Sequence, residues 1–147
     1  MRVQVSFSGL TSGDTASHIH VINGPGDANT ADTLGPVATT TPTFTGFPGG
    51  VTAGTFDSTF DMLLASSYRP GFITDAGGIA AAEAALFTGI TDGRAYLNIH
   101  TTNFPGGEIR GFLQPQQTTS PVPEPGTLLL VGTGIAGFLR MRGRRLI

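Results

Sequence analysis

Three histidines are the residues of this chain whose type and spacing could do chemistry. His18 and His20 lie two positions apart in an apolar, strand-like run, and His100 lies in a second such run. Residues two apart on a β-strand share a face, so His18 and His20 point the same way while Ile19 turns toward the core. Neutral imidazoles suit both copper and zinc, and strands can aim several of them at one point. The spacing therefore indicates a copper or zinc site made by His18, His20 and His100.

A structural role is the alternative, in which the three histidines hydrogen-bond within a sheet and stabilise the fold. No other residues form a catalytic constellation. The serines stand in no nucleophile-elbow setting, residues 9–14 lack the lysine of a phosphate-binding loop, and the chain has no cysteine. We therefore expect a protein that is not an enzyme, with metal-dependent redox activity through the histidines left open.

The third histidine belongs to a predicted β-hairpin. Residues 95–101 alternate between small or apolar and polar side chains, residues 103–107 contain the turn-forming sequence Phe-Pro-Gly-Gly, and residues 108–113 again suit a strand. The alternation directs Leu97 and Ile99 toward the core and His100 to the opposite face. His100 can therefore approach the other two histidines if their strands are neighbours.

The remaining pattern favours a β-rich domain. The chain has 147 residues with 22 glycines and 10 prolines, and its apolar runs are short. The pattern predicts strands over 2–10, 17–22 and 55–64 and an extended, edge-lying segment over 35–47. It also predicts a short Ala-rich helix over 79–87 that stops at Gly89.

Charge separates the two ends of the chain. There is no lysine, and four of the eight arginines fall in the last eight residues. Residues 1–139 hold four arginines against ten acidic residues, a net charge of −6, which repels nucleic acid. Nucleic acid is therefore excluded as a partner of the domain, and the basic end needs another explanation.

Several motifs together resemble the CHRD domain, a module named for chordin that also occurs in bacterial exported proteins. They are VSFSGLTSGDTASHIH at 5–20, GPV at 35–37, PTFTGFPGGVTAGTF at 42–56, the Ala-rich run before the AYLNIHT strand, and FPGGEIRG at 104–111. The resemblance implies an all-β, immunoglobulin-like (Greek-key) sandwich or barrel. It also implies a signal peptide and a further strand pair upstream, so we expect the chain to be truncated at its N-terminus.

The C-terminal end resembles a PEP-CTERM sorting signal, which consists of a motif, a hydrophobic helix and a basic end. The motif is Pro123, Glu124 and Pro125, the predicted membrane anchor contains Leu128, Leu129, Leu130, Val131, Ile135, Phe138 and Leu139, and the basic stop is Arg140, Arg142, Arg144 and Arg145. The arginines would stay in the cytoplasm by the positive-inside rule, which places the domain outside. The resemblance implies cleavage by a sorting enzyme of the exosortase type.

The histidine pattern is also similar to the copper strands of copper/zinc superoxide dismutases, although only these three positions match and the bridging histidine is absent. We expect a CHRD-like domain over residues 1–115, a linker over 116–122 and a sorting and transmembrane segment over 123–147. The predicted function is an exported, membrane-anchored binding or structural domain that acts at the cell surface or in the extracellular matrix, with a matrix or polysaccharide partner. The alternative is a copper or zinc protein.

Overall fold

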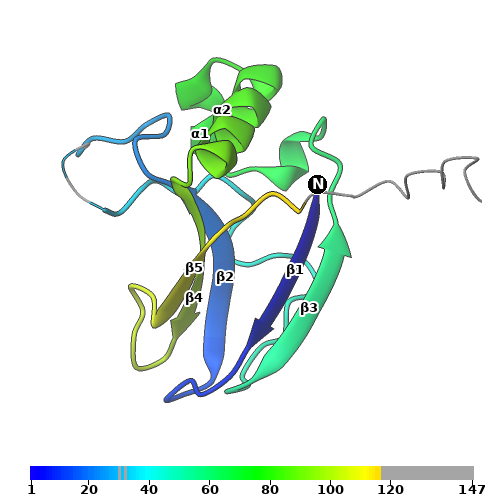
Figure 1. Ribbon diagram of the computed structural model, residues 1–147, viewed down its shortest axis with the longest axis vertical. Helices are drawn as coiled ribbons and strands as arrows, with labels where there is room; N and C mark the ends of the chain where they lie inside the picture. The colour runs from blue at the N-terminus through cyan, green and yellow to red at the C-terminus, as the bar shows by residue number, and fades with distance from the viewer. Residues whose placement is uncertain (30, 32, 117–147) are drawn as a thin grey trace, which may run out of the picture. The chain divides into compact units, whose positions relative to one another are not determined.

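The computed structural model describes residues 1–29, 31 and 33–116 (Figure 1). The order of elements along this part of the chain is β1 (Arg2–Phe7), β2 (Asp14–Val21), β3 (Gly54–Thr59), the 3-10 helix η1 (Ala65–Ser67), α1 (Pro70–Ala76), α2 (Ile79–Thr91), β4 (Ala95–Thr101) and β5 (Ile109–Phe112). Residues Met1–Pro115 make one compact unit. A β-rich fold is thereby confirmed, with two α-helices where one was expected.

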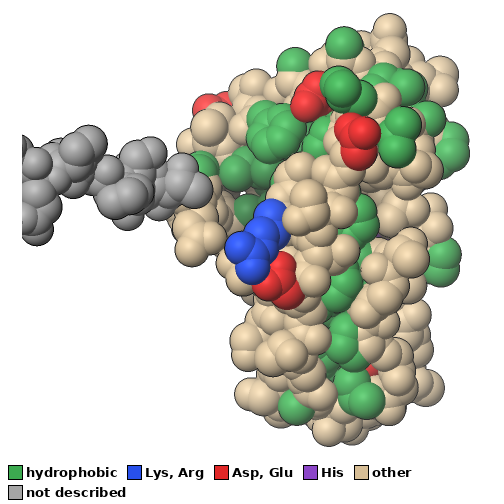
Figure 2. Space-filling model, turned by 90° about the vertical axis from the view of Figure 1, so that its right-hand side faces the viewer, with side chains coloured by type: hydrophobic (Ala, Val, Ile, Leu, Met, Phe, Trp, Pro, Cys, Tyr) green, Lys and Arg blue, Asp and Glu red, His purple; other side chains and the backbone are tan. Residues whose placement is uncertain are grey.

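The strands form two antiparallel sheets, β1–β3 and β2–β4–β5. The predicted hairpin is present as β4 and β5, in which Ile99 pairs with Ile109. Both helices lie toward one end of the sheets (Figure 1). Figure 2 shows the side that carries the β1–β3 sheet, where hydrophobic side chains form scattered patches and no histidine is visible.

One hydrophobic core joins the two sheets and the helices, because strand alternation turns an apolar face of each sheet inward. Its members come from β1, β2, β3, β4, α1, α2 and the connecting segments, and include Val3, Phe7, Ile19, Val21, Phe44, Phe56, Phe72, Leu86, Leu97 and Ile99. The segment before Phe44 lies beside β2. Val37 pairs with His20, and the Ala38 N–H donates to the Ile19 carbonyl at 2.8 Å. The edge-lying segment expected from the sequence is therefore found where it flanks β2.

Helix α1 was not predicted, although both of its end signals are in the sequence. Pro70 occupies the first turn, where its missing N–H costs nothing, and Gly77 ends the helix in the left-handed conformation with φ of 90°. Phe72 is fully buried and anchors the helix to the core. Seven residues are too few to form a stable helix alone, so no helix was expected here, and the packing of Phe72 stabilises it.

Strand β3 is shorter than the predicted strand over 55–64. Asp61 ends the extended conformation, since its side chain accepts a hydrogen bond from the Leu63 N–H at 2.9 Å and its carbonyl accepts from the Leu64 N–H at 3.3 Å. This local bonding is a turn that competes with the sheet ladder. The following segment then leads into η1.

Helix α2 also runs further than predicted, through Gly89 to Thr91. A Cβ atom at Gly89 would lie 2.6 Å from Val21 Cγ1, so this glycine permits the close approach of α2 to β2 and does not stop the helix. The chain turns instead at Gly93, whose φ is 69°. The prediction of a stop at Gly89 was wrong because close packing and chain termination both select glycine.

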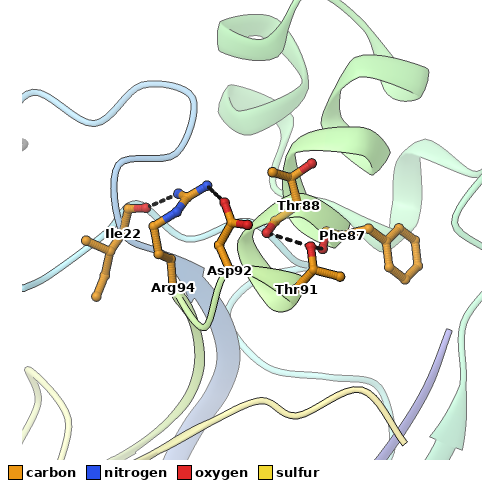
Figure 3. Close-up of polar contacts among 6 residues, drawn as sticks. All are labelled: Ile22, Phe87, Thr88, Thr91, Asp92 and Arg94. Atoms are coloured by element: carbon orange, nitrogen blue, oxygen red, sulfur yellow. Dashed lines mark hydrogen bonds and ion pairs between the residues drawn. The ribbon is translucent and has the colours of Figure 1, made fainter. Parts of the chain in front are cut away.

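A polar junction then ties the end of α2 to β2 and β4 (Figure 3). Arg94 donates to the Ile22 carbonyl at 2.6 Å and to Asp92 at 3.0 Å, and Thr91 Oγ1 donates to the Phe87 carbonyl at 2.9 Å. This junction sets where β4 begins beside the end of β2. It thereby helps to hold the register on which the histidines depend.

The described part of the chain contains no helix long and apolar enough to cross a membrane. The predicted C-terminal hydrophobic helix and sorting motif, over residues 123–147, lie outside the described residues.

Candidate metal centre

The register of β2 and β4 brings the three histidines together on one face of the three-stranded sheet. His18 lies opposite Asn98, and Ala16 lies opposite His100, so His100 sits diagonally from His18. One ring nitrogen from each of His18, His20 and His100 lies within 4.8 Å of the others. The predicted convergence of the three imidazoles on a common point is therefore what the geometry shows.

Each imidazole is held by a backbone carbonyl on its Nδ1 side. His18 Nδ1 lies 2.8 Å from the Pro42 oxygen, His20 Nδ1 lies 2.7 Å from the Gly35 oxygen, and His100 Nδ1 lies 2.8 Å from the Pro105 oxygen. A carbonyl oxygen can only accept, so each Nδ1 carries a hydrogen. In the neutral ring this leaves Nε2 with a free lone pair, which is the tautomer and second-layer support typical of metal-binding histidines.

The Nε2 atoms of His18 and His100 face each other at short range. His18 Nε2 and His100 Nε2 are 3.0 Å apart, and His20 Nε2 is buried and has no hydrogen-bond partner among the described residues. Two lone pairs at 3.0 Å repel, and a proton or a metal ion shared between them removes that repulsion. A buried acceptor without a partner is also costly. Both features are expected of ligands and are not expected of histidines that only stabilise a sheet.

Burial keeps two of the three rings neutral near pH 7. Burial lowers the pKa of His18 to about 4, outweighing the hydrogen bond to Pro42 that acts in the opposite direction, and the charges of His20 and His100 lower it further. The pKa of His20 is also lowered, first by burial and to a smaller extent by the charges of His100 and Arg69. Metals bind the unprotonated imidazole, so these shifts leave the nitrogens ready to coordinate.

A second layer of side chains, which was not predicted as part of the site, fixes the rings. The Tyr96 ring stacks on His20 with centroids 5.0 Å apart and planes within 3°, and the Arg110 guanidinium lies 5.2 Å from the Tyr96 centroid. Asn98 Nδ2 lies 3.3 Å from both His100 Nε2 and the Gly106 carbonyl. Both Tyr96 and Asn98 share the histidine face of β4, so strand alternation was the signal that could have identified them.

Two glycines allow the loops to deliver their carbonyls. A Cβ at Gly35 would lie 2.1 Å from the Val21 oxygen, and a Cβ at Gly107 would lie 2.3 Å from the Asn98 amide. Gly107 also has a φ of 113°, a conformation that favours glycine. These glycines come from the GPV and FPGG motifs, which therefore position Gly35 and Pro105 against the rings.

The fold and the site define a class of protein: an antiparallel β domain with two short helices and a three-histidine cluster on one sheet face. The family model of the CHRD domain matches residues 1–113, so the chain belongs to the CHRD domain family. The model of the PEP-CTERM protein-sorting motif matches residues 121–145. No curated protein and no solved structure matches the chain. The resemblances to the CHRD domain and to the PEP-CTERM sorting signal are confirmed by these matches.

The sorting motif indicates where the protein is located. A PEP-CTERM motif indicates an exported protein that is anchored in the membrane, processed by an exosortase and sorted to the cell surface. The predicted motif residues Pro123, Glu124 and Pro125 lie within the matched range but outside the described residues, as do the anchor and the basic stop.

Proposed function

We propose that this protein is an exported, surface-sorted CHRD domain that binds one copper or zinc ion through His18, His20 and His100. The observation that carries the proposal is the common orientation of the rings, in which three Nδ1 atoms donate to carbonyls and one nitrogen of each ring lies within 4.8 Å of the others. Three imidazoles leave room for a fourth ligand, such as water or an anion. The role is binding of the ion, and we propose no catalysed reaction.

The site is preorganised, which supports a tight complex. The rings are oriented by the backbone of the 35–42 segment and the 103–107 turn, both of which are fixed to the sheet by further bonds. A ligand set held in place before the ion arrives loses little conformational entropy on binding. The His18 and His100 rings would have to separate only slightly to admit a metal ion, because nitrogen ligands about 2.0 Å from zinc stand about 3.3 Å apart.

A metal titration of the full chain tests the proposal. Calorimetry with copper and with zinc should show one ion per chain, and His20→Ala and His100→Ala should each weaken binding by at least about a hundredfold because each removes one of three ligands. Thr102→Ala, at an exposed position near His100, serves as the matched control. Binding that is equal in all four proteins would contradict the site.

The same proposal includes the roles of the C-terminal residues in sorting and membrane anchoring. We propose that Pro123, Glu124 and Pro125 are recognised by the exosortase-type enzyme, that Leu128, Leu129, Leu130, Val131, Ile135, Phe138 and Leu139 lie in the membrane, and that Arg140, Arg142, Arg144 and Arg145 remain on the cytoplasmic side. Glu124→Ala should leave the protein membrane-bound and unprocessed, which blotting of membrane and surface fractions measures.

A metal-independent binding module is the second candidate. An apolar groove of about 340 Å³ lies between β1 and β5, and its lining includes Val5, Phe7, Leu97, Ile109 and Leu113. Within the described residues the flanking edges of β1 and β5 pair with no other strand. Free edges beside an apolar groove suit an extended polypeptide of a matrix protein better than a polysaccharide. In that case loss of His100 would leave surface or matrix attachment unchanged.

The proposed topology is the immunoglobulin-like, Greek-key sandwich that the family resemblance implies. Two antiparallel sheets that share one core support it.

A further inference from the structure

The candidate site has no charged ligand of its own. Its three ligands are neutral imidazoles, the chain has no cysteine, and no carboxylate belongs to the cluster in the part of the chain that the structure describes. The ligands therefore supply no negative charge to offset a bound cation. Most of the compensation would have to come from elsewhere.

Two arginines lie near the cluster. Arg69 acts electrostatically on His20, and its side chain is fixed by a hydrogen bond from Nε to the Val37 carbonyl at 3.0 Å. Arg110 lies against the Tyr96 ring that stacks on His20. Asp75 stands 3.8 Å from Arg69 and offsets part of its charge, but the carboxylate is not among the cluster's ligands. The surroundings thus penalise added positive charge.

Burial acts in the same direction as the arginines. His18 is 7% exposed and the rings of His20 and His100 are half-buried. The cost of moving an ion out of water grows with the square of its charge, so a divalent ion pays about four times the penalty of a monovalent one. Repulsion from each arginine is likewise about twice as large for a divalent ion. Imidazole nitrogen suits copper and zinc alike, so the ligand type does not choose the ion, and we expect the charge of the ion to discriminate.

We infer that the three-histidine cluster selects copper(I) over copper(II) and zinc(II). The inference rests on the metal-binding function proposed above and names the ion. It follows from three neutral donors, partial burial and the nearby arginine charges. Three converging nitrogens match the low coordination number that copper(I) accepts. A monovalent ion also needs no anionic ligand to balance its charge.

Competition titrations of the full-length protein test this inference. Copper(I) affinity is measured under anaerobic conditions against bicinchoninate, and copper(II) and zinc(II) affinities are measured against chromophoric chelators of each ion. We expect copper(I) to bind at least about a hundredfold more tightly than copper(II), and still more tightly than zinc(II). His100→Ala should lose affinity for all three ions.

A charge variant with a matched control tests the cause. Arg69→Gln removes the positive charge and keeps a donor for the Val37 carbonyl, and Arg69→Lys keeps the charge. The ratio of copper(I) to copper(II) affinity should fall about three- to tenfold in Arg69→Gln and stay unchanged in Arg69→Lys, because a partly exposed charge is screened. Thermal unfolding of both variants checks that the fold is intact.

The outcomes separate this inference from the proposed function. Copper(II) or zinc(II) bound as tightly as copper(I) would overturn the inference and leave a metal site in place. No binding of any ion would overturn both. An unchanged ratio in Arg69→Gln would contradict the electrostatic origin of the preference.

Discussion

The two faces of the β2–β4–β5 sheet are built from alternate residues of the same strands, and they differ in chemistry. One face carries Ile19, Leu97 and Ile99, which pack into the core. The other carries His18, His20 and His100, whose rings are tied to the carbonyls of two loops. The apolar face gains stability from contact with many neighbours, whereas the histidine face depends on a few directed hydrogen bonds. The apolar face depends on how much surface is buried, and the histidine face depends on where a few atoms are placed.

If the comparison holds, truncation on the apolar face should cost the most stability. Ile99 is 2% exposed and belongs to the core. Ile99→Ala removes buried methylenes and leaves a cavity, so the free energy of unfolding should fall by about 2–5 kcal/mol. Chemical denaturation of the metal-free protein measures it. The neighbouring change His100→Ala, on the half-buried face, should cost much less, and equal costs would break the comparison.

Acid should destabilise the protein through the histidine face, by somewhat less than truncation of the apolar face does. The pKa of His18 is lowered to about 4 by burial, from the usual value near 6.5. The unfolded chain therefore takes up this proton first, and the stability that His18 contributes is complete above pH 6.5 and is lost as the pH falls to 4. For the metal-free protein this loss should amount to about 3 kcal/mol.

Urea denaturation between pH 7 and pH 4 checks this linkage. His18→Gln, which can still donate to the Pro42 carbonyl, should show a shallower decline because it has no titrating ring. The same decline in both proteins would mean that the buried histidine does not carry the pH dependence.

A smaller effect is expected from the turn that supports His100. Gly107→Ala places a Cβ against Asn98 at a φ of 113°. Displacement of Asn98 and of the Pro105 carbonyl should lower metal affinity about tenfold, the effect typical of second-layer changes. Gly106→Ala is the control, since its Cβ would meet open space at an ordinary φ. Equal affinities in the two variants would show that the turn does not orient His100.

Strand periodicity predicted the parts of this structure that depend on local pattern. The β4–β5 hairpin, the shared face of His18 and His20 and the opposite direction of Ile19 all follow from alternation. The two sorting and family resemblances likewise rest on contiguous motifs. The Asn98 and Tyr96 support could have been identified by the same alternation, because both residues lie on the histidine face of β4.

The rest depends on contacts between distant segments. Nothing local to residues 35–42 indicates that the Gly35 and Pro42 carbonyls will reach His20 and His18. In the sequence Gly89 looks like a glycine that ends a helix. Only its close packing against Val21 shows that it allows the helix to approach β2. Helix α1 likewise forms because Phe72 enters the core. These features were missed because the deciding partner lies far away in the sequence.

The central claim is that the three imidazoles bind one metal ion through Nε2. X-ray absorption spectroscopy of the copper-loaded full-length protein tests it most directly, because imidazole rings give a characteristic outer-shell scattering. The account predicts about three nitrogen ligands at about 2.0 Å with the scattering of about three imidazoles, reduced to two in His20→Ala. Copper surrounded only by oxygen ligands, with no imidazole scattering, would contradict it.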